Sequence, residues 1–551
     1  MVRPGQMFST LAAAGRNENV RRVELAWGAS IAAEWAHFVA LGVFAYDHGG
    51  TSAVGVAGLV RLLPAAVIAP FAASLGDRFR RERVLLAMTL VGCVALAGSA
   101  AAYYASSRLL VFAFAAVLGL ATTLIRPALQ ALLPSLARTP EELIAANGAT
   151  STIESLGTLI GPLLAGIIVS VANAGVVFAG AAGALALAAV LFSLVRVEGR
   201  IEIDEHLSTR QLVSDGLRSM WRAADARLLI GLIAAQTFVR GCLNVLIVVA
   251  AFDVLDAGAG AVGYMTAAIG VGGLIGAIGA MALEGRSLAV PFGAALVFWG
   301  APLMLIAPQP QIIVAVVLLA VVGAANSVED VAVFTLLQRI IPDELLTRVL
   351  GVLWGVAMGA VALGSIAAPL VVDWVGARAA FAVVGAVLPA LVLLSYRRLV
   401  AIDRAAVPAP ELELIDQVPM FAPLSVAGKE RIASKLLQHA VRAGDVVIRA
   451  GEAGDGFYLV GAGELDIDAG GRHTTARRGD YFGEIALLHD VPRTATVTAA
   501  ADSRLLELHR DDFLAAVTGH SVAHAAGHEV AASRLALGQD ADATKSVMSG
   551  Q

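Results

Sequence analysis

The chain has 551 residues, which is too long for a single domain, and 58% of them are hydrophobic whereas only 15% are charged. Because a soluble protein carries about 25% charged residues, most of this chain is expected to lie in a membrane. The net charge of −5 gives no sign of nucleic-acid binding, and two cysteines, Cys93 and Cys242, are too few for a disulfide framework or a metal site.

The N-terminal segment, residues 1–22, is polar and lacks the apolar region and cleavage site of a signal peptide. The first apolar run after it is therefore expected to remain as a helix. Runs of about twenty apolar residues, long enough to cross a bilayer, then recur as far as Leu399. They predict twelve transmembrane helices, at residues 23–46, 52–76, 83–105, 108–133, 142–171, 174–196, 227–255, 261–284, 288–307, 311–341, 346–373 and 377–398.

Arginines divide the loops between these spans into two classes. They gather before the first span, between the second and third, in the central linker and after the last span. The opposite loops hold almost none, with Arg108 and Arg378 as the exceptions. Because arginine-rich loops stay on the cytoplasmic side, both termini are predicted to be cytoplasmic, in a multi-pass protein of the plasma membrane, the inner membrane of a bacterium.

The loop after the second predicted span, residues 73–81, reads ASLGDRFRR. It resembles motif A of the major facilitator superfamily, G-xxx-D-R-x-G-R-(R/K), with both glycines of that motif replaced. In this family the loop braces the two halves in the outward-facing state, so the resemblance implies a gating role for Asp77, Arg78 and Arg81. The alternative is a plain cluster of basic residues on the cytoplasmic side.

The fifth predicted span contains GTLIGPLLAG at residues 157–166. This sequence resembles motif C, which marks exporters and proton antiporters of the same superfamily, and it depends on Gly157, Gly161 and Pro162. Small residues allow helices to approach closely and a proline kinks a helix. The resemblance favours export, whereas ordinary close packing of helices is the alternative reading.

Two short sequences recur at a nearly constant offset. PEEL at residues 140–143 corresponds to PDEL at 342–345, and LGTLIGPL at 156–163 corresponds to LGSIAAPL at 363–370. The repeat predicts two homologous six-helix halves. They would occupy residues 23–196 and 227–398, joined by a cytoplasmic linker with an amphipathic helix at 197–226. Residues 126–148 are also similar to the macrolide and siderophore exporter branch of the superfamily.

Polar and ionisable residues inside the predicted spans are the candidates for transport chemistry, because a charge at mid-membrane costs about 2.5–3.5 kcal/mol on insertion scales. They are Glu34, His37, Arg61, Arg126, Glu154, Arg240, Asn326, Glu329 and Asp330. The sequence has no phosphate-binding G-xxxx-G-K-(S/T) loop. An ATP-driven pump or another enzyme is therefore not expected, and transport would use an ion gradient.

Aligning the two halves places Arg126 opposite Asp330, so these side chains are expected to meet near the central axis. We expect Glu34, Glu329 or Asp330 to exchange protons under the influence of Arg126 or Arg240. Static salt bridges that lock neighbouring helices are the alternative for each of these residues. Transport measured with Asp330→Asn or Glu34→Gln would separate the two readings.

After a linker at residues 399–412 the composition changes to alternating strands with glycine turns. Residues 479–488 read GDYFGEIALL and residues 492–497 read PRTATV. This pair resembles the phosphate-binding cassette of cyclic nucleotide-binding domains. The resemblance implies an α+β domain built on a β jelly roll over residues 413–537, followed by a disordered tail at 538–551.

The residue types of the cassette suit an anionic phosphate. A glycine allows the backbone to approach a ligand, the helix that follows offers free N–H groups, and arginine can hold a phosphate with two hydrogen bonds. The family resemblance implies that Glu484 accepts a hydrogen bond from the ribose 2′-hydroxyl, and that a lid within 521–537 reaches the ligand through Arg534 or Leu535. The implied binding residues are Gly483, Glu484, Ile485, Ala486, Arg493, Thr494 and Ala495.

Together these features predict an all-α membrane bundle of twelve helices followed by a cyclic nucleotide-binding jelly roll. The predicted function is proton-coupled export of a small molecule, regulated by cytosolic cAMP, with cGMP as a possible second ligand and no metal. Two alternatives remain: a membrane-anchored sensor that transports nothing, and an exporter of the cyclic nucleotide itself. A jelly roll in which Glu484 and Arg493 form an ion pair without any ligand is a third reading of the C-terminal region.

Overall fold

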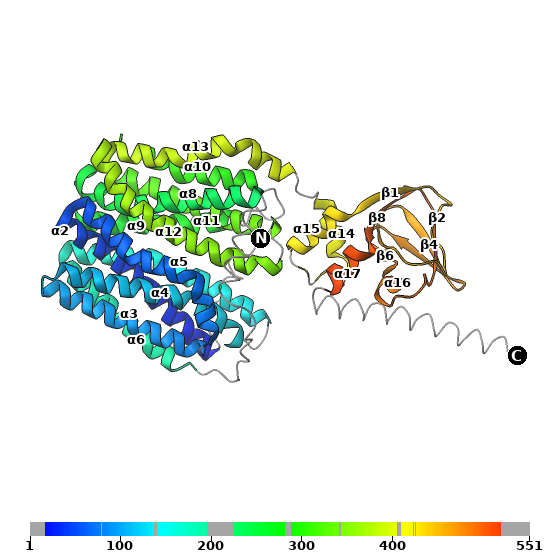
Figure 1. Ribbon diagram of the computed structural model, residues 1–551, viewed down its shortest axis with the longest axis horizontal. Helices are drawn as coiled ribbons and strands as arrows, with labels where there is room; N and C mark the ends of the chain where they lie inside the picture. Colours follow the sequence, from blue (N-terminus) through cyan, green and yellow to red (C-terminus); the bar gives the residue numbers. More distant parts are fainter. Residues whose placement is uncertain are drawn as a thin grey trace. The chain divides into compact units, whose positions relative to one another are not determined.

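Figure 1 shows the protein as a computed structural model, which describes residues 17–78, 80–136, 140–195, 224–280, 288–340, 343–404, 409–422, 424 and 426–518. The chain divides into two compact units. The first is helical and ends at Arg404, and the chain from Ala405 onward belongs to the second. The described residues leave out most of the linker expected at 197–226, the lid with Arg534 and Leu535, and the tail at 538–551.

The first unit consists of helices that follow the predicted apolar runs. They are α2 (Glu18–Arg78), α3 (Arg81–Tyr104), α4 (Arg108–Leu136), α5 (Pro140–Val171), α6 (Ala174–Ser193), α8 (Ala224–Val249), the π-helix η1 (Ala250–Val254), α9 (Ala259–Ala280), α10 (Ala289–Ile306), α11 (Ile312–Ile340), α12 (Asp343–Val375) and α13 (Ala377–Arg404). Within the part of the chain that the structure describes, eleven helices are long and apolar enough to cross a membrane. The predicted helical membrane bundle is therefore confirmed, whereas the count of twelve spans is not.

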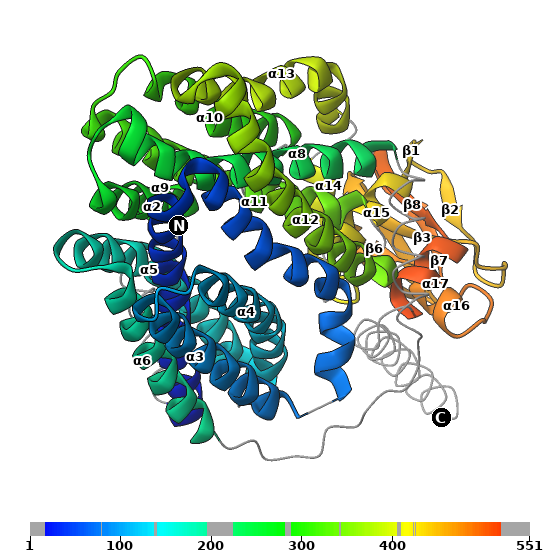
Figure 2. The same ribbon diagram turned by 60° about the vertical axis from the view of Figure 1, so that its left-hand side comes forward.

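Helix α2 accounts for the difference, because it contains both the first and the second predicted spans. Its 61 residues would extend about 90 Å as a straight helix, roughly three times the thickness of a bilayer core. The helix is interrupted at Gly50, whose φ of 62° and ψ of −157° lie in a region that only glycine adopts readily. Figure 2 shows α2 bending back on itself, so the chain before and after Gly50 forms two separate arms.

The predicted loop at residues 73–81 is mostly helical. Helix α2 continues to Arg78 and α3 begins at Arg81, which shortens the connection between them to two residues, of which Arg80 is described. At the C-terminal end of the bundle's sequence, α13 continues to Arg404 and α14 begins at Ala409. Both ends of the linker expected at 399–412 are therefore helical.

The core of the helical unit lies where α2 packs against α4, α5 and α6. A cluster of buried side chains includes Trp27, Leu85, Leu129, Ala146 and Phe192, which come from five different helices. Further contacts pair α2 with α12 and α5 with α9. In Figures 1 and 2, α3, α4 and α6 lie together on one side of this unit, and α8, α10 and α13 lie on the other.

Glycines allow several helices to approach at backbone distance. A Cβ atom added to Gly119 of α4 would lie 2.1 Å from the carbonyl oxygen of Arg61 in α2. A Cβ atom added to Gly323 of α11 would lie 2.0 Å from the carbonyl oxygen of Ile269 in α9. Real atoms do not approach so closely, so a side chain at either position would push two helices apart.

We expect Gly119→Ala and Gly323→Ala to lower the melting temperature of the detergent-solubilised protein. Alanine normally favours a helix over glycine by up to about 1 kcal/mol, but overpacking of this kind costs about 1–3 kcal/mol. The matched control is Gly180→Ala, since nothing lies within 4 Å of a Cβ atom added there. Thermal unfolding of the three variants would contradict the packing if all of them melted like the parent chain.

The second unit is an antiparallel sandwich of two four-stranded sheets, ordered β1-β8-β3-β6 and β2-β7-β4-β5. Its strands are β1 (Leu437–Val441), β2 (Val446–Ile448), β3 (Gly456–Ala462), β4 (Glu464–Ala469), β5 (Arg472–Arg477), β6 (Tyr481–Phe482), β7 (Thr496–Ala499) and β8 (Ser503–His509). Its helices are α14 (Ala409–Asp416), α15 (Val426–Lys435), α16 (Glu484–Leu488) and α17 (Arg510–Thr518). The predicted β-sheet domain after the bundle is thereby confirmed.

Two apolar clusters hold this unit together. Alternation along the strands places Val460, Leu465 and Leu505 between the two sheets. Phe421 and Phe513 pack with Phe457 on the side covered by the helices, and the rings of Phe457 and Phe513 stack at 4.9 Å. Strand β3 contributes to both clusters and pairs with β6, the strand that leads into the cassette.

Candidate functional site

The cassette predicted from the sequence forms one compact turn of the second unit. Strand β6 ends at Phe482, Gly483 follows with a φ of 93°, and α16 begins at Glu484. Gly483 is required for two reasons. Its positive φ disfavours any side chain, and a Cβ atom at this position would lie 2.7 Å from Nη1 of Arg493.

Arg493 is the central residue of the site, and only 5% of it is exposed. Its Nη1 donates to the carbonyl oxygen of Gly483 at 3.1 Å, and its Nη2 donates to that of Gly456 at 2.9 Å. Nη2 also lies 3.3 Å from the carboxylate of Asp455, which is largely exposed. A buried arginine needs such partners, and these hold the guanidinium in one position before any ligand arrives.

The remaining cassette residues differ in their exposure. Glu484 is 1% exposed and Ala486 is 3% exposed, whereas Ile485 is half-buried. A Cβ atom added to Gly454 would lie 2.7 Å from Cβ of Ala486, so the loop before β3 closes directly onto α16. Thr494 is exposed and Ala495 is half-buried. Of the predicted residues, the structure brings Gly483 and Arg493 into contact across the spacer.

Sequence reasoning missed a second row of polar groups beside Arg493. The ring of Tyr458 lies 5.8 Å from the guanidinium carbon, and its hydroxyl donates to Oε1 of Glu507 at 3.2 Å. The other carboxylate oxygen of Glu507 lies 2.6 Å from Nε2 of His439. Burial, followed by the negative charges of Glu507 and Asp455, raises the pKa of Tyr458 to about 12. The phenol is therefore neutral at physiological pH and acts as a donor.

Among the described residues, two ion pairs join candidates for transport chemistry on the helices. Nη2 of Arg61 and Oε1 of Glu34 are 2.7 Å apart and connect the two arms of α2. Arg126 of α4 pairs with Glu154 of α5. The sequence singled out all four residues but did not predict these pairings. Because each charge has an opposite charge beside it, the energy of burying these groups is reduced.

The candidates on α11 belong to a polar network with α8. Nδ2 of Asn326 donates to Asp330 at 2.9 Å, and Oδ1 of Asn326 accepts from Gln236 at 3.4 Å and from the indole of Trp299 at 3.2 Å. Arg240 lies close enough to Asp330 for their charges to interact. These contacts join three helices of the C-terminal part of the bundle, α8, α10 and α11.

Asp330 also lies within electrostatic reach of Arg126 and Glu154. The predicted meeting of Arg126 and Asp330 therefore has a structural counterpart, although Arg126 takes Glu154 as its direct partner. Glu329, the neighbour of Asp330, is 2% exposed and interacts with Asp330 and with the charge of Arg240.

His37 has no hydrogen-bond partner for either ring nitrogen among the described residues, although it is completely buried. Its ring lies 5.4 Å from that of Phe178. Sequence reasoning also missed Glu24, which is 4% exposed and accepts a hydrogen bond from Thr150 at 2.5 Å. An acidic residue within an apolar run was the available signal.

The two family motifs of the bundle lie at different kinds of position. Gly157 and Gly161 of motif C face the first arm of α2, since an added Cβ would lie 2.6 Å from Ile31 and 2.4 Å from the carbonyl oxygen of Ala32. The residue after them, Pro162, lies where Gly263 of α9 approaches α5. The motif A residues Asp77 and Arg78 end α2, and Arg81 begins α3.

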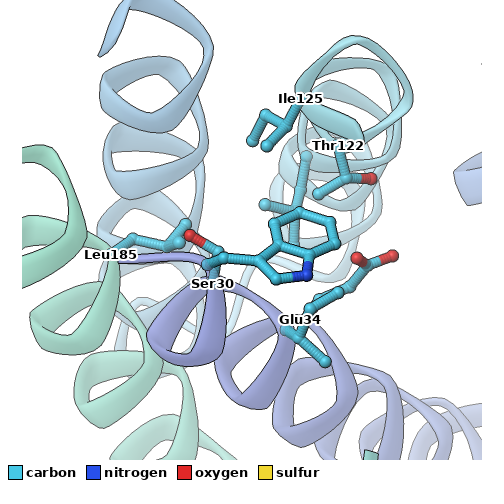
Figure 3. Close-up of a pocket in the computed structure, with 8 residues that line it drawn as sticks. Ser30, Glu34, Thr122, Ile125 and Leu185 are labelled. Atoms are coloured by element: carbon cyan, nitrogen blue, oxygen red, sulfur yellow. The ribbon is translucent and has the colours of Figure 1, made fainter. Parts of the chain in front are cut away.

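A small cavity lies beside Glu34. It has a volume of about 10 Å³ and is lined by residues that include Trp27, Ser30 and Thr122. Figure 3 shows the oxygen atoms of Glu34 and Thr122 on the same side of this space. The volume is close to the smallest space that holds one water molecule, about 10–15 Å³.

Two family models match the chain. The model of the Major Facilitator Superfamily matches residues 25–360, and the model of the cyclic nucleotide-binding domain matches residues 438–520. The first match covers more than half of the 551 residues. The second covers all eight strands of the sandwich except the first residue of β1, and it includes the cassette.

Similar proteins were found for the C-terminal region. The cAMP-dependent protein kinase regulatory subunit of Yarrowia lipolytica is 41% identical over 102 residues, 18% of this chain and 27% of that protein. The corresponding subunit of Aspergillus niger is 38% identical over 102 residues, 18% of this chain and 25% of that protein. The solved regulatory domain of Toxoplasma gondii PKA with cAMP shares 32% identity over 19% of this chain and 42% of that chain, with a TM-score of 0.19.

The chain spans about a quarter of the length of these curated relatives. The similarity is therefore to their cyclic nucleotide-binding region, whereas the helical bundle is matched by the other family model. The chain belongs to the major facilitator superfamily, and its helical bundle is followed by a cyclic nucleotide-binding domain.

Proposed function

We propose that this chain is a secondary transporter that exports a small molecule in exchange for protons and whose activity responds to cAMP. The observation that carries the regulatory part is the position of Arg493. Its guanidinium is buried and held by two carbonyl oxygens, in the same chain as a membrane bundle with paired internal charges. A domain that served only as a structural appendage would not need a prearranged cation.

The donors and acceptors around Arg493 fit a cyclic nucleotide. A guanidinium suits the anionic phosphate, and the carboxylate of Glu484 suits a ribose hydroxyl. The matched relatives are regulatory subunits of cAMP-dependent protein kinases, which supports cAMP as the ligand. Thr494 places an additional hydroxyl next to Arg493 in the chain, and cGMP is therefore tested beside cAMP.

We include twelve membrane crossings and two six-helix halves in the proposal. The interruption at Gly50 divides α2 into two arms, each long enough to cross a bilayer. Gly119 and Gly323, at corresponding positions of the sequence repeat, make the same kind of close helix contact. The resemblance of the Gly157–Gly166 region to motif C supports export as the direction of transport.

Proton exchange is proposed for Glu34, Glu329 or Asp330. Each is an acidic group inside the bundle with an arginine nearby. A helical bundle that only anchored a sensor to the membrane would not need such charges. In the same proposal Asp77, Arg78 and Arg81 act as a gate, as the resemblance to motif A implies. Regulation requires cAMP to bind one conformation of the chain more tightly than the other, and the lid at 521–537 is the segment proposed to close.

The experiment that tests this function uses the full chain in proteoliposomes. Calorimetric titration with cAMP and with cGMP measures binding. Transport of labelled probes, driven by an imposed pH gradient and measured with and without the nucleotide, measures regulation. Micromolar or tighter binding together with a change in transport rate is expected. Nucleotide binding without any transport would favour the alternative of a membrane-anchored sensor. Accumulation of cAMP inside the proteoliposomes would identify the nucleotide as the cargo.

Gly483→Ala is expected to weaken cAMP binding about ten- to hundredfold, because the new methyl group displaces a guanidinium that makes charge-assisted hydrogen bonds. The matched control is Gly444→Ala. Gly444 has a φ of 92°, close to that of Gly483, but nothing lies within 4 Å of a Cβ atom added there. Both variants carry about 1–2 kcal/mol of backbone strain, so they differ in the contacts of the new methyl group, of which the one with Arg493, at 2.7 Å, is the tightest. Equal nucleotide affinities in calorimetry would contradict this role of Gly483.

A further inference from the structure

A second cavity, of about 30 Å³, lies between the N-terminal and C-terminal helices of the bundle. Its lining comes from both arms of α2 and from α8, α9 and α12. Most of the lining is apolar, with Phe38, Val54 and Val248 among its members, and its polar members are Arg61, Asn244 and Ser365. The cavity therefore combines an apolar wall with one cation and two neutral polar groups.

Arg61 has unused hydrogen-bonding capacity at this cavity. It is 9% exposed, and its Nη2 is engaged by Glu34. Its Nε lies buried with no acceptor in hydrogen-bond distance among the described residues. The guanidinium carbon also lies 5.6 Å from the centre of the Phe38 ring. A buried N–H without an acceptor is unfavourable, so this donor marks a place where an acceptor on a ligand would be stabilised.

The two members of the ion pair line different cavities. Glu34 lines the smaller one, and Arg61 lines the larger one between the two groups of helices. A ligand in the larger cavity meets the cation of the pair and not its carboxylate. An anionic group there would gain a charge-assisted hydrogen bond, whereas an organic cation would be repelled by Arg61.

We propose that the larger cavity binds the cargo and that the cargo is an organic anion with an apolar body, for which Arg61 supplies the counter-charge. The apolar lining would receive the body of the molecule. This inference rests on the proposed transport function and names the chemistry of its cargo. As it stands the space is smaller than an aromatic anion, so entry requires the helices on its two sides to separate, as alternating access demands.

The test compares two probes of the same shape, benzoate and benzamide, on the full chain in detergent. Equilibrium dialysis with labelled probes is expected to show benzoate bound more tightly than benzamide. Arg61→Gln is expected to weaken benzoate binding about ten- to 150-fold, the range for a hydrogen bond to a charged group, and to leave benzamide unchanged. Arg108→Gln, which removes a guanidinium at the start of α4 that donates to the carbonyl oxygen of His48 in α2, is the control and should bind benzoate like the parent chain.

The Glu34→Gln variant distinguishes loss of the counter-charge from misfolding of Arg61→Gln. It removes the carboxylate that competes for Arg61, so benzoate affinity should rise about 5- to 150-fold, the usual size of a coupling between two sites. Misfolding cannot produce a gain of affinity. Failure of the parent chain to prefer benzoate over benzamide, or equal benzoate affinity in the parent and Arg61→Gln, would overturn the inference.

The outcomes for the cargo and for transport are separable. Transport of ethidium without Arg61-dependent binding of benzoate would leave the proposed transport function standing and overturn the anionic cargo. Conversely, benzoate binding that depends on Arg61, in a chain that moves no probe, would support the binding site and overturn the transport function.

Discussion

Replacing Arg493 with alanine is expected to weaken cAMP binding by about 2–5 kcal/mol, the range for truncating one partner of a buried charge pair. Arg493 is 5% exposed, so a phosphate that reaches it is shielded from water and their attraction is strong. Calorimetric titration of the full chain measures this loss. Arg493→Lys should lie between the parent and the alanine variant, because lysine keeps the charge but not the planar fork.

The same substitution has a structural effect that must be separated from binding. The guanidinium satisfies the carbonyl oxygens of Gly483 and Gly456, and loss of their donor costs about 1–3 kcal/mol of stability if they remain buried. Thermal unfolding therefore accompanies each titration. Arg478→Ala, which removes an exposed arginine from the turn before the cassette, is the control. Undiminished binding by a folded Arg493→Ala variant would show that the phosphate does not use this residue.

The cassette could be predicted because its parts are close in sequence. Gly483, Glu484 and Arg493 lie within one turn and its spacer, so local geometry brings them together wherever the domain folds. The partners of Arg493 on β3 could not be predicted in this way. Asp455 and Gly456 precede Arg493 by almost forty residues, and only the pairing of β3 with β6 and β8 places them beside it.

The ion pairs of the bundle show a similar limit. Glu34 and Arg61 were recognised as buried charges, but their pairing depends on the angle between the two arms of α2, which the backbone of Gly50 sets. That angle cannot be predicted from the hydropathy of the sequence or from the spacing of its charged residues. By contrast, the proximity of Asp330 to Arg126 followed from aligning the two repeats, because a repeat carries information on three-dimensional position across about two hundred residues.

Asp330→Asn and Glu34→Gln are expected to lower transport driven by a pH gradient by about 5- to 150-fold, as loss of a coupling free energy of about 1–3 kcal/mol implies. Asparagine and glutamine keep the size of the side chain but cannot release a proton. The measurement is the initial rate of transport in proteoliposomes, with benzoate, ethidium and chloramphenicol as anionic, cationic and neutral probes. Asp225→Asn, at an exposed pair with Arg398, is the control, since such surface pairs contribute little. Unchanged transport rates in both variants would show that these carboxylates form static salt bridges and do not exchange protons.

Whether proton binding strengthens or weakens cargo binding can show which carboxylate carries the proton. At Glu34, protonation frees Arg61 of its partner, so a proton and an organic anion would favour each other's binding. At Asp330 the nearby arginines lie beside a carboxylate that also accepts from Asn326, and a proton there would compete with any hydrogen-bond donor that the cargo presents. Competition is what exchange of cargo for protons requires, whereas mutual support would carry both in the same direction. Benzoate affinity that rises as the pH falls, and loses this dependence in Glu34→Gln, would therefore assign Glu34 to the cargo and leave the exchanged proton to Asp330 or Glu329.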